Sequence, residues 1–219
     1  MSKDNGTLLP LFIVVSVLFL LTVLFIILYP TIKKLYFKKH FLSVYGKQIY
    51  KLANKQDYYL INNLALKGDD EVSNVKIDHL LCGNKYIYVV SDSYFDGALD
   101  AKAKDRSWIY YQRKNRKEFI RRKIDNPILI AENRTQRLMN ITNLDASLLI
   151  TIILINNNCQ INEDFELAKD NTYLIPIGKF NKLISNLEKR DVSNINPVQL
   201  KNAVHDIANL NLNKKHERK

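Results

Sequence analysis

A single apolar block near the N-terminus constrains the fold of this chain most. The block LLPLFIVVSVLFLLTVLFIILY, Leu8 to Tyr29, holds 22 residues and no charge. As a helix rising about 1.5 Å per residue it would be about 33 Å long, enough to cross a hydrocarbon core of roughly 30 Å. A cleavable signal peptide would have an apolar region of roughly 7 to 15 residues preceded by positive charge. Only Lys3 precedes this block, so we predict a retained transmembrane anchor, against a cleaved signal or a buried core helix.

The charges around the block predict its orientation, because cytoplasmic ends carry the excess of lysine and arginine. Lys33, Lys34, Lys38 and Lys39 follow the block. We therefore predict a single-pass protein of the cell membrane with most of the chain in the cytoplasm. The predicted divisions are a short outer tail (1–7), a transmembrane helix (8–30), a basic juxtamembrane segment (31–41), a folded domain (42–190), and a C-terminal helix with a charged tail (191–219).

Basic residues exceed acidic ones across the whole chain, with 33 Lys and Arg against 22 Asp and Glu, a formal charge of +11. Such an excess favours an anionic partner, either nucleic acid or the anionic inner leaflet of a membrane. A lysine-rich and asparagine-rich composition from an AT-rich genome is the alternative explanation. The isolated Cys82 and Cys159 suit buried thiols in a reducing compartment, and their spacing fits neither a disulfide framework nor a zinc site.

Hydrophobic periodicity divides the rest of the chain into short strands and helices. SLLITIILIN, Ser147 to Asn156, has the length and β-branched composition of a central strand buried on both faces. Asn126-Pro127 opens a helical pattern with proline in the first turn. The predicted strands lie within 57–68, 74–83, 85–93, 107–112, 147–156 and 172–178, and the predicted helices cover 42–54, 127–142, 179–189 and 198–212. This order predicts the α/β class, with a mixed central sheet flanked by helices and preceded by one transmembrane helix.

A family resemblance is carried by KIDHLLCGNKYIYVVSDSYFDG, Lys76 to Gly97, which reads as two strands around a Gly-Asn turn. Together with GKQIYKLANKQDYYLINNLAL before it, and Trp108 and Asn126-Pro127 after it, this stretch resembles the nuclease-related domain (NERD) family over roughly residues 44–189. That family belongs to the PD-(D/E)XK-like nuclease superfamily. The resemblance implies a restriction-endonuclease-like fold and a site where carboxylates hold Mg²⁺, which activates a water molecule.

The catalytic pattern that the resemblance implies is incomplete. The family has an aspartate at the end of one strand and Glu-x-Lys on the next, and the aspartate corresponds to Asp78. Ser91 and Ser93 stand where the glutamate and the lysine should be. Asp92 lies between them and, in a regular strand, points to the opposite face unless a β-bulge turns it. A lone carboxylate is a poor Mg²⁺ site, so we expect no cofactor and lost catalysis.

Two further family positions also depart from the pattern. The glutamate of the first helix falls at Lys47 or Gln48, and a glutamine after Asn-Pro is replaced by Ile130. Asp78 is then either a surviving metal ligand or a strand-end residue that bonds a turn. His79, its neighbour, is either a general base or a structural residue.

A basic segment, RKNRKEFIRRK, follows the strand candidate SWIYYQ and is expected to form a loop near the sheet. Its seven cations are Arg113, Lys114, Arg116, Lys117, Arg121, Arg122 and Lys123. The nearby aromatic residues are Trp108, Tyr110, Tyr111 and Phe119, which either stack on unpaired bases or belong to the core. The cations can neutralise the phosphates of nucleic acid, lie on anionic lipid, or form a solvated charge run.

Three functional hypotheses follow. The first is a membrane-anchored NERD-like pseudoenzyme that binds DNA or RNA or acts as a scaffold. The second is an active nuclease with a rearranged Mg²⁺ site made of Asp78, Asp92 and either Asp96 or Asp100. The third is an interaction module at the membrane surface, for lipid or protein, with no role in nucleic-acid binding. The sequence identifies no protein partner.

Overall fold

The computed structural model describes residues 5–67, 74–114, 118–162, 165 and 171–213. Residues 1–4 of the predicted outer tail and residues 214–219 of the charged tail lie outside this part. The described chain separates into two compact units, residues 1–44 and residues 45–219. Each unit is described by itself.

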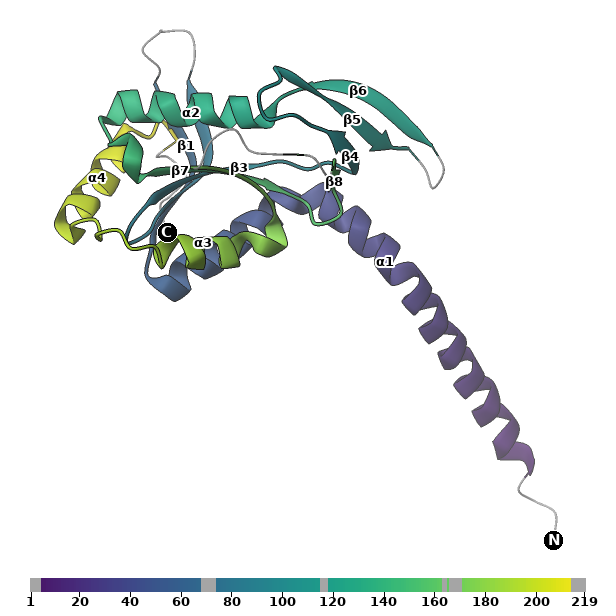
Figure 1. The fold of residues 1–219 in the computed structure, drawn as a ribbon. Coiled ribbons are helices and arrows are strands. Elements are labelled where there is room, and N and C mark those ends of the chain that lie inside the picture. Colours follow the sequence, from purple (N-terminus) through teal and green to yellow (C-terminus); the bar gives the residue numbers. More distant parts are fainter. Residues whose placement is uncertain (1–4, 68–73, 115–117, 163–164, 166–170, 214–219) are drawn as a thin grey trace. The chain divides into compact units, whose positions relative to one another are not determined.

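The first unit consists of most of helix α1, Asn5–Gln56 (Figure 1). Residues 10–33 form a helical span with a mean hydropathy of 3.3, long and apolar enough to cross a membrane. Its apolar side chains are exposed on all sides, as Phe12 and Phe19 are, which suits a helix surrounded by lipid. The basic stretch that follows is helical too, except at His40, where the backbone leaves helical values (φ −120°, ψ 19°).

The second unit contains a five-stranded mixed sheet with strand order β1-β2-β3-β7-β9. The pairs β1–β2 and β2–β3 are antiparallel, and β3–β7 and β7–β9 are parallel. Every residue of β7 is buried, which confirms the predicted central strand. The strands are β1 Tyr59–Leu66, β2 Val75–Cys82, β3 Ile87–Asp92, β7 Leu149–Ile155 and β9 Thr172–Pro176.

Helices cover both faces of this sheet. Figure 1 shows α2 and α3 on opposite sides of it. Leu138 of α2 and Leu200 of α4 share one apolar core with β1, β2 and β3, while Tyr88 on the other face of β3 donates a 2.6 Å hydrogen bond to Glu188 of α3. The helices are α2 Pro127–Thr142, α3 Phe180–Glu188 and α4 Pro197–Leu210, with short 3₁₀ turns at Ala146–Leu148 and Ile177–Lys179. The predicted mixed sheet flanked by helices is therefore confirmed.

Helix α2 begins at the residue that the sequence predicts. The Asn126 side chain accepts a hydrogen bond from the backbone N–H of Ile128, and Pro127 occupies the first turn, where a missing N–H leaves no bond unmade. Asn143 ends the helix in the left-handed conformation (φ 51°). Local capping alone thus fixes both ends of the helix.

A second sheet of four strands, in the order β6-β5-β4-β8, is absent from the sequence prediction. Its strands are β4 Gly97–Asp100, β5 Ser107–Arg113, β6 Phe119–Asp125 and β8 Gln160–Ile161. The expected loop of basic residues is wrong for 119–123, because these residues belong to β6, which pairs with β5 as an antiparallel strand along its whole length. Strands β4 and β8 are too short for a periodic pattern, and they pair across about 60 residues of chain.

Gly97 makes the second sheet possible. A Cβ atom at this position would lie 1.9 Å from the backbone oxygen of Tyr111, and φ is +153°. Only glycine permits such a close approach of two backbones. Gly97 ends the stretch that carries the family resemblance, and the structure gives a reason for a glycine at this position.

Candidate functional site

Strands β1 and β2 change their side-chain alternation at the candidate site. Ile61 and Leu64 both face the same core, as do Ile77 and Leu80, so consecutive core residues are three apart instead of two. Asn63 lies in the interrupted stretch with φ +51°. A strand that keeps its pleat would alternate without this shift. The irregularity brings a short polar stretch of each strand, Asn62–Asn63 and Asp78–His79, to the end of β3.

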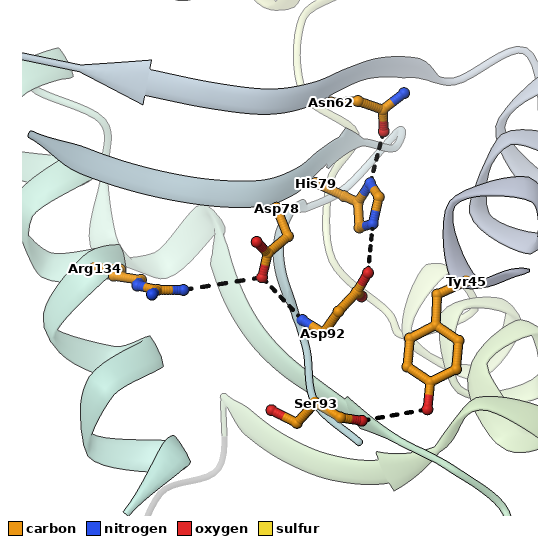
Figure 2. Close-up of polar contacts among 7 residues, drawn as sticks. All are labelled: Tyr45, Asn62, Asp78, His79, Asp92, Ser93 and Arg134. Atoms are coloured by element: carbon orange, nitrogen blue, oxygen red, sulfur yellow. Dashed lines mark hydrogen bonds and ion pairs between the residues drawn. The ribbon is translucent and has the colours of Figure 1, made fainter. Parts of the chain in front are cut away.

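His79 lies at the centre of a buried polar network (Figure 2). Its Nδ1 is 2.6 Å from Oδ1 of Asn62, and its Nε2 is 2.9 Å from Oδ2 of Asp92. The side chains of His79 and Asp92 are only 8% and 1% exposed. Both ring nitrogens face side-chain oxygen atoms, so His79 links Asn62 of β1 to the buried carboxyl group of Asp92.

The carboxyl group of Asp92 is in a strongly desolvated position. Burial raises its pKa above the ordinary 3.8, the hydrogen bond and charge of His79 oppose this shift, and the nearby Asp78 adds to it. Its second oxygen, Oδ1, is buried and makes no hydrogen bond within the described structure. The side-chain partner of the Asp92 carboxyl group is thus His79.

Asp78, the remnant of the catalytic pattern, also has its partners within the chain. Its Oδ2 accepts a 3.0 Å hydrogen bond from the backbone N–H of Asp92 and lies 3.9 Å from Nη1 of Arg134 on α2. Figure 2 shows the carboxylate between these two groups. About a third of the Asp78 side chain is exposed (35%). The Asp78 carboxylate, beside a guanidinium and a backbone N–H, therefore has the contacts of a structural hydrogen-bond acceptor.

Ser91 and Ser93, which the resemblance assigns to the glutamate and lysine positions, supply no charge. Ser91 is buried on β3, and its Oγ has no hydrogen-bond partner within the described structure. Ser93 follows β3, where its N–H bonds the backbone oxygen of Leu154 and its own backbone oxygen accepts a 3.3 Å bond from the hydroxyl of Tyr45. Burial and the charge of Asp92 raise the pKa of that hydroxyl.

The residues present do not fit a Mg²⁺ site. Among the described residues, no group of three or more His, Cys, Asp or Glu side chains is placed to share a metal ion. Asp96 and Asp100, the additional ligands of the rearranged-site hypothesis, lie beside and at the end of β4, in the second sheet. Of the other family positions, Gln48 donates a 3.0 Å bond to the backbone oxygen of Ile177, and Ile130 is exposed on α2.

The described part of the basic segment lies at the end of β5 and along β6, two strands that pair as an antiparallel β-ribbon. Arg113 and Lys114 lie at the end of β5, and Arg121, Arg122 and Lys123 lie on β6, the edge strand of the second sheet. All five are exposed. The other two predicted binding residues, Arg116 and Lys117, lie outside the described residues.

The two faces of the ribbon differ sharply. On the inner face Trp108 is buried and donates a 2.8 Å bond from Nε1 to the backbone oxygen of Lys102, and Tyr110 packs edge-on against Phe95. Trp108 is thus a core residue, and Tyr110 is half-buried and packs against the same core.

The outer face follows from the pairing of β5 with β6, in which Ile109 opposes Lys123, Tyr111 opposes Arg121 and Arg113 opposes Phe119. Paired residues share a face, so cations and aromatic rings alternate there. The guanidinium of Arg113 lies 5.7 Å from the centre of the Phe119 ring, which is half exposed. We call these six residues the ribbon face: Ile109, Tyr111, Arg113, Phe119, Arg121 and Lys123.

Sequence reasoning missed the partners that define the remnant site, chiefly Arg134, Asn62 and the pairing of His79 with Asp92. Arg134 lies 56 residues from Asp78 in the chain and resembles any other polar residue of an amphipathic helix. No signal in one sequence identifies such a contact, because it depends on how α2 packs over β2.

The second unit is an α/β domain with a mixed sheet, in which Asp78 lies in the middle of β2 beside the aromatic-rich strand β3. The family model described as "Nuclease-related domain" matches residues 46–155, half of the chain. The chain therefore belongs to the nuclease-related domain family, as the sequence resemblance predicted.

Two solved structures resemble the chain at low sequence identity. One is a protein of unknown function, AF1548, with 12% identity, a TM-score of 0.38, and coverage of 74% of this chain and 78% of that chain. The other is the small subunit of the heterodimeric restriction endonuclease R.BspD6I, with 15% identity, a TM-score of 0.32, and coverage of 77% and 87%. No curated protein sequence matches the chain.

Proposed function

We propose that this protein is a membrane-anchored module of the nuclease-related domain family that binds single-stranded nucleic acid without cleaving it. Residues 10–33 anchor the chain in the cell membrane, and residues 45–219 lie on the cytoplasmic side, where the lysines after the anchor favour them. The observation that carries the proposal is the ribbon face, where three exposed cations lie beside the exposed ring of Phe119 and the half-buried ring of Tyr111.

The ribbon face has the chemistry that unpaired nucleic acid requires. Lysine and arginine neutralise phosphates and release condensed counterions, and aromatic rings stack on bases whatever their sequence. Binding of this kind is sequence-tolerant and falls steeply with salt. A duplex hides the faces of its bases, so the single strand is the better ligand.

The remnant site supports the absence of cleavage. Asp78 already accepts a backbone N–H and faces Arg134, while Asp92 is paired with His79. A divalent ion would have to displace these partners and would then find serines at the positions of glutamate and lysine. We therefore propose that no Mg²⁺ cofactor is used.

The test uses the full chain in nanodiscs of phosphatidylcholine and a fluorescent thymidine dodecamer. We expect salt-dependent binding and no cleavage after incubation with Mg²⁺ or Mn²⁺. The variant Arg113→Gln, Arg121→Gln, Lys123→Gln should reduce the slope of log K against log salt by about 2, at roughly 0.7 per phosphate contact. The matched control Lys182→Gln, Lys189→Gln, Lys201→Gln removes the same charge from exposed positions on or beside α3 and α4.

Three results would overturn the proposal. Equal losses in the ribbon variant and the control would mean that net charge, not the ribbon face, attracts the strand. Metal-dependent cleavage abolished by Asp78→Ala would establish an active nuclease instead. Binding to phosphatidylserine vesicles with no preference for the dodecamer over heparin would establish a surface module for anions in general.

A further inference from the structure

A groove beside the remnant site is accounted for by none of the roles above. It has a volume of about 550 Å³ and lies between the start of β2 and roughly the first three turns of α2, with Arg106 and Asp125 at one end. Its lining includes the N-cap Asn126 and five residues of one α2 face, Leu129, Ile130, Asn133, Arg134 and Arg137. Their spacing of three and four residues places them on the same side of the helix. We call this cavity the α2 groove.

The charge of the α2 groove is strongly positive. Its lining contains the cationic side chains of Lys76, Arg106, Arg134 and Arg137, and among the described lining residues Asp125 supplies the one carboxylate. Guanidinium groups match the geometry of phosphate oxygens and bind them through two parallel hydrogen bonds. The groove therefore has the electrostatic character of a phosphate site.

The floor of the groove adds an apolar component. Leu129 and Ile130 are 37% and 42% exposed on α2, next to the cations and to the amide of Asn133. A groove that combines arginines, an amide and exposed aliphatic side chains suits a ligand with a charged part and a flat apolar part. A nucleotide has both, whereas an inorganic phosphate uses only the cations.

Asp78 is placed to position one of these cations. Its carboxylate is held by the backbone N–H of Asp92 at 3.0 Å and lies 3.9 Å from Nη1 of Arg134. Arg134 is half-buried, so its guanidinium can meet Asp78 on one side and the groove on the other. The carboxylate that the family pattern assigns to a metal ion here orients an arginine.

The α2 groove continues from the ribbon face. Residues at alternate positions of β6 share a face, so Asp125 lies on the same side as Arg121 and Lys123. Asp125 also lines the groove, and Arg106, at its end, directly precedes β5. A strand that leaves the ribbon face at the end of β6 thus arrives at the groove.

We propose that the α2 groove binds one nucleotide of the single strand whose other nucleotides lie along the ribbon face. This inference rests on the proposed function and extends it. Arg106, Arg134 and Arg137 hold the phosphate, Leu129 and Ile130 contact the base, and Asp78 is a positioning residue for Arg134. The ligand class is a nucleoside monophosphate unit within DNA or RNA.

The experiment measures two ligands by calorimetry on the full chain in phosphatidylcholine nanodiscs, thymidine 5′-monophosphate and a thymidine dodecamer. Arg134→Gln with Arg137→Gln should abolish monophosphate binding and weaken dodecamer binding roughly tenfold to a hundredfold, as expected for lost charged hydrogen bonds. A double variant on the ribbon face, Arg121→Gln with Lys123→Gln, should weaken dodecamer binding and leave monophosphate binding unchanged. Thermal unfolding of each variant shows whether the fold is retained.

A double-mutant cycle tests the role of Asp78 separately. Asp78→Asn should lower monophosphate affinity in the wild-type background and have no effect when Arg134 is already glutamine, since the residues act as one unit. Equal effects in both backgrounds would overturn the positioning role, because a purely structural loss would be independent of Arg134.

The outcomes separate the two proposals. If the dodecamer binds through the ribbon face while the groove variant changes nothing, the groove inference fails and the proposed function stands. If the dodecamer does not bind at all, the proposed function fails, and the inference, which rests on it, fails too. If vesicles containing a phosphoinositide bind and the groove variant removes only that binding, the phosphate belongs to a lipid headgroup and the nucleotide inference is overturned.

Discussion

In the five-stranded sheet the polar side chains at the end of β3 form hydrogen bonds with groups of the same unit. In the four-stranded sheet the charged side chains of the β5–β6 ribbon are exposed. His79 and Asp92 are almost fully buried and paired, while Arg121 and Lys123 are exposed on an edge strand. The same kinds of residue therefore have different effects in the two sheets. Buried pairs affect stability, and exposed cations affect what the protein attracts.

The largest effect is expected from His79→Ala. Removing His79 leaves the buried carboxyl group of Asp92 without its hydrogen-bonded partner, and breaking a buried pair in this way typically destabilises a fold by about 3–5 kcal/mol. Urea denaturation of the full chain in nanodiscs, followed by tryptophan fluorescence, measures the change. The control Asp92→Asn keeps a hydrogen-bond acceptor without the charge and should cost less; a loss for His79→Ala of under about 1 kcal/mol would contradict the buried pair.

Gly97→Ala tests the second sheet and should have the next largest effect. The added Cβ would overlap the Tyr111 backbone oxygen, and strained backbone of this kind costs on the order of 1–3 kcal/mol. Because β4 links β5 to β8, hydrogen exchange should speed up in β4 and β5 and stay slow in β7. Gly178→Ala is a useful control, since the nearest atom to its added Cβ is the side-chain oxygen of Asn157. Uniform acceleration in both sheets would argue against their independence.

Phe119→Ala tests the outward face and should change binding but not stability. Stacking of one base on an exposed ring contributes about 1–3 kcal/mol, and we expect the lower value, about a fivefold loss in dodecamer affinity. Tyr59→Ala, at a comparably exposed ring on β1, is the matched control. If both variants lose affinity equally, the ring of Phe119 has no specific contact with the strand.

The smallest effect concerns the pH dependence of stability. The raised pKa of Asp92 means that, above 3.8 and up to its raised value, the folded chain holds a proton that the unfolded chain has released. Stability from this group therefore falls as pH rises through that window. Urea denaturation from pH 3 to pH 7 should show that the stability difference between wild type and Asp92→Asn declines with pH. A difference that rises instead would mean that His79 dominates and lowers this pKa.

Much of the fold could be predicted because its signals are local. Asn126-Pro127 marks the start of α2, and the β-branched run of 149–155 marks a buried strand. The second sheet could not be predicted, since β4 and β8 are very short and their pairing joins distant parts of the chain. Strand β6 was missed because its charges resemble those of a solvated loop, while its partner β5 satisfies its backbone.

The candidate site also has features that the sequence predicts and features that only the structure shows. The family pattern placed Asp78, Ser91 and Ser93 without help from the structure. The contact of Asp78 with Arg134 depends on the packing of α2. The pairing of Asp92 with His79 depends on the irregular pleat at Asn63.

The sequence by itself determined the apolar helix and the order of most strands and helices, because each is a property of neighbouring residues. Only the tertiary structure decided which carboxylates are paired internally and which cations remain on the surface. The physical reason is that desolvation and charge pairing depend on groups brought together from distant positions, and these terms decide what a charged side chain can do.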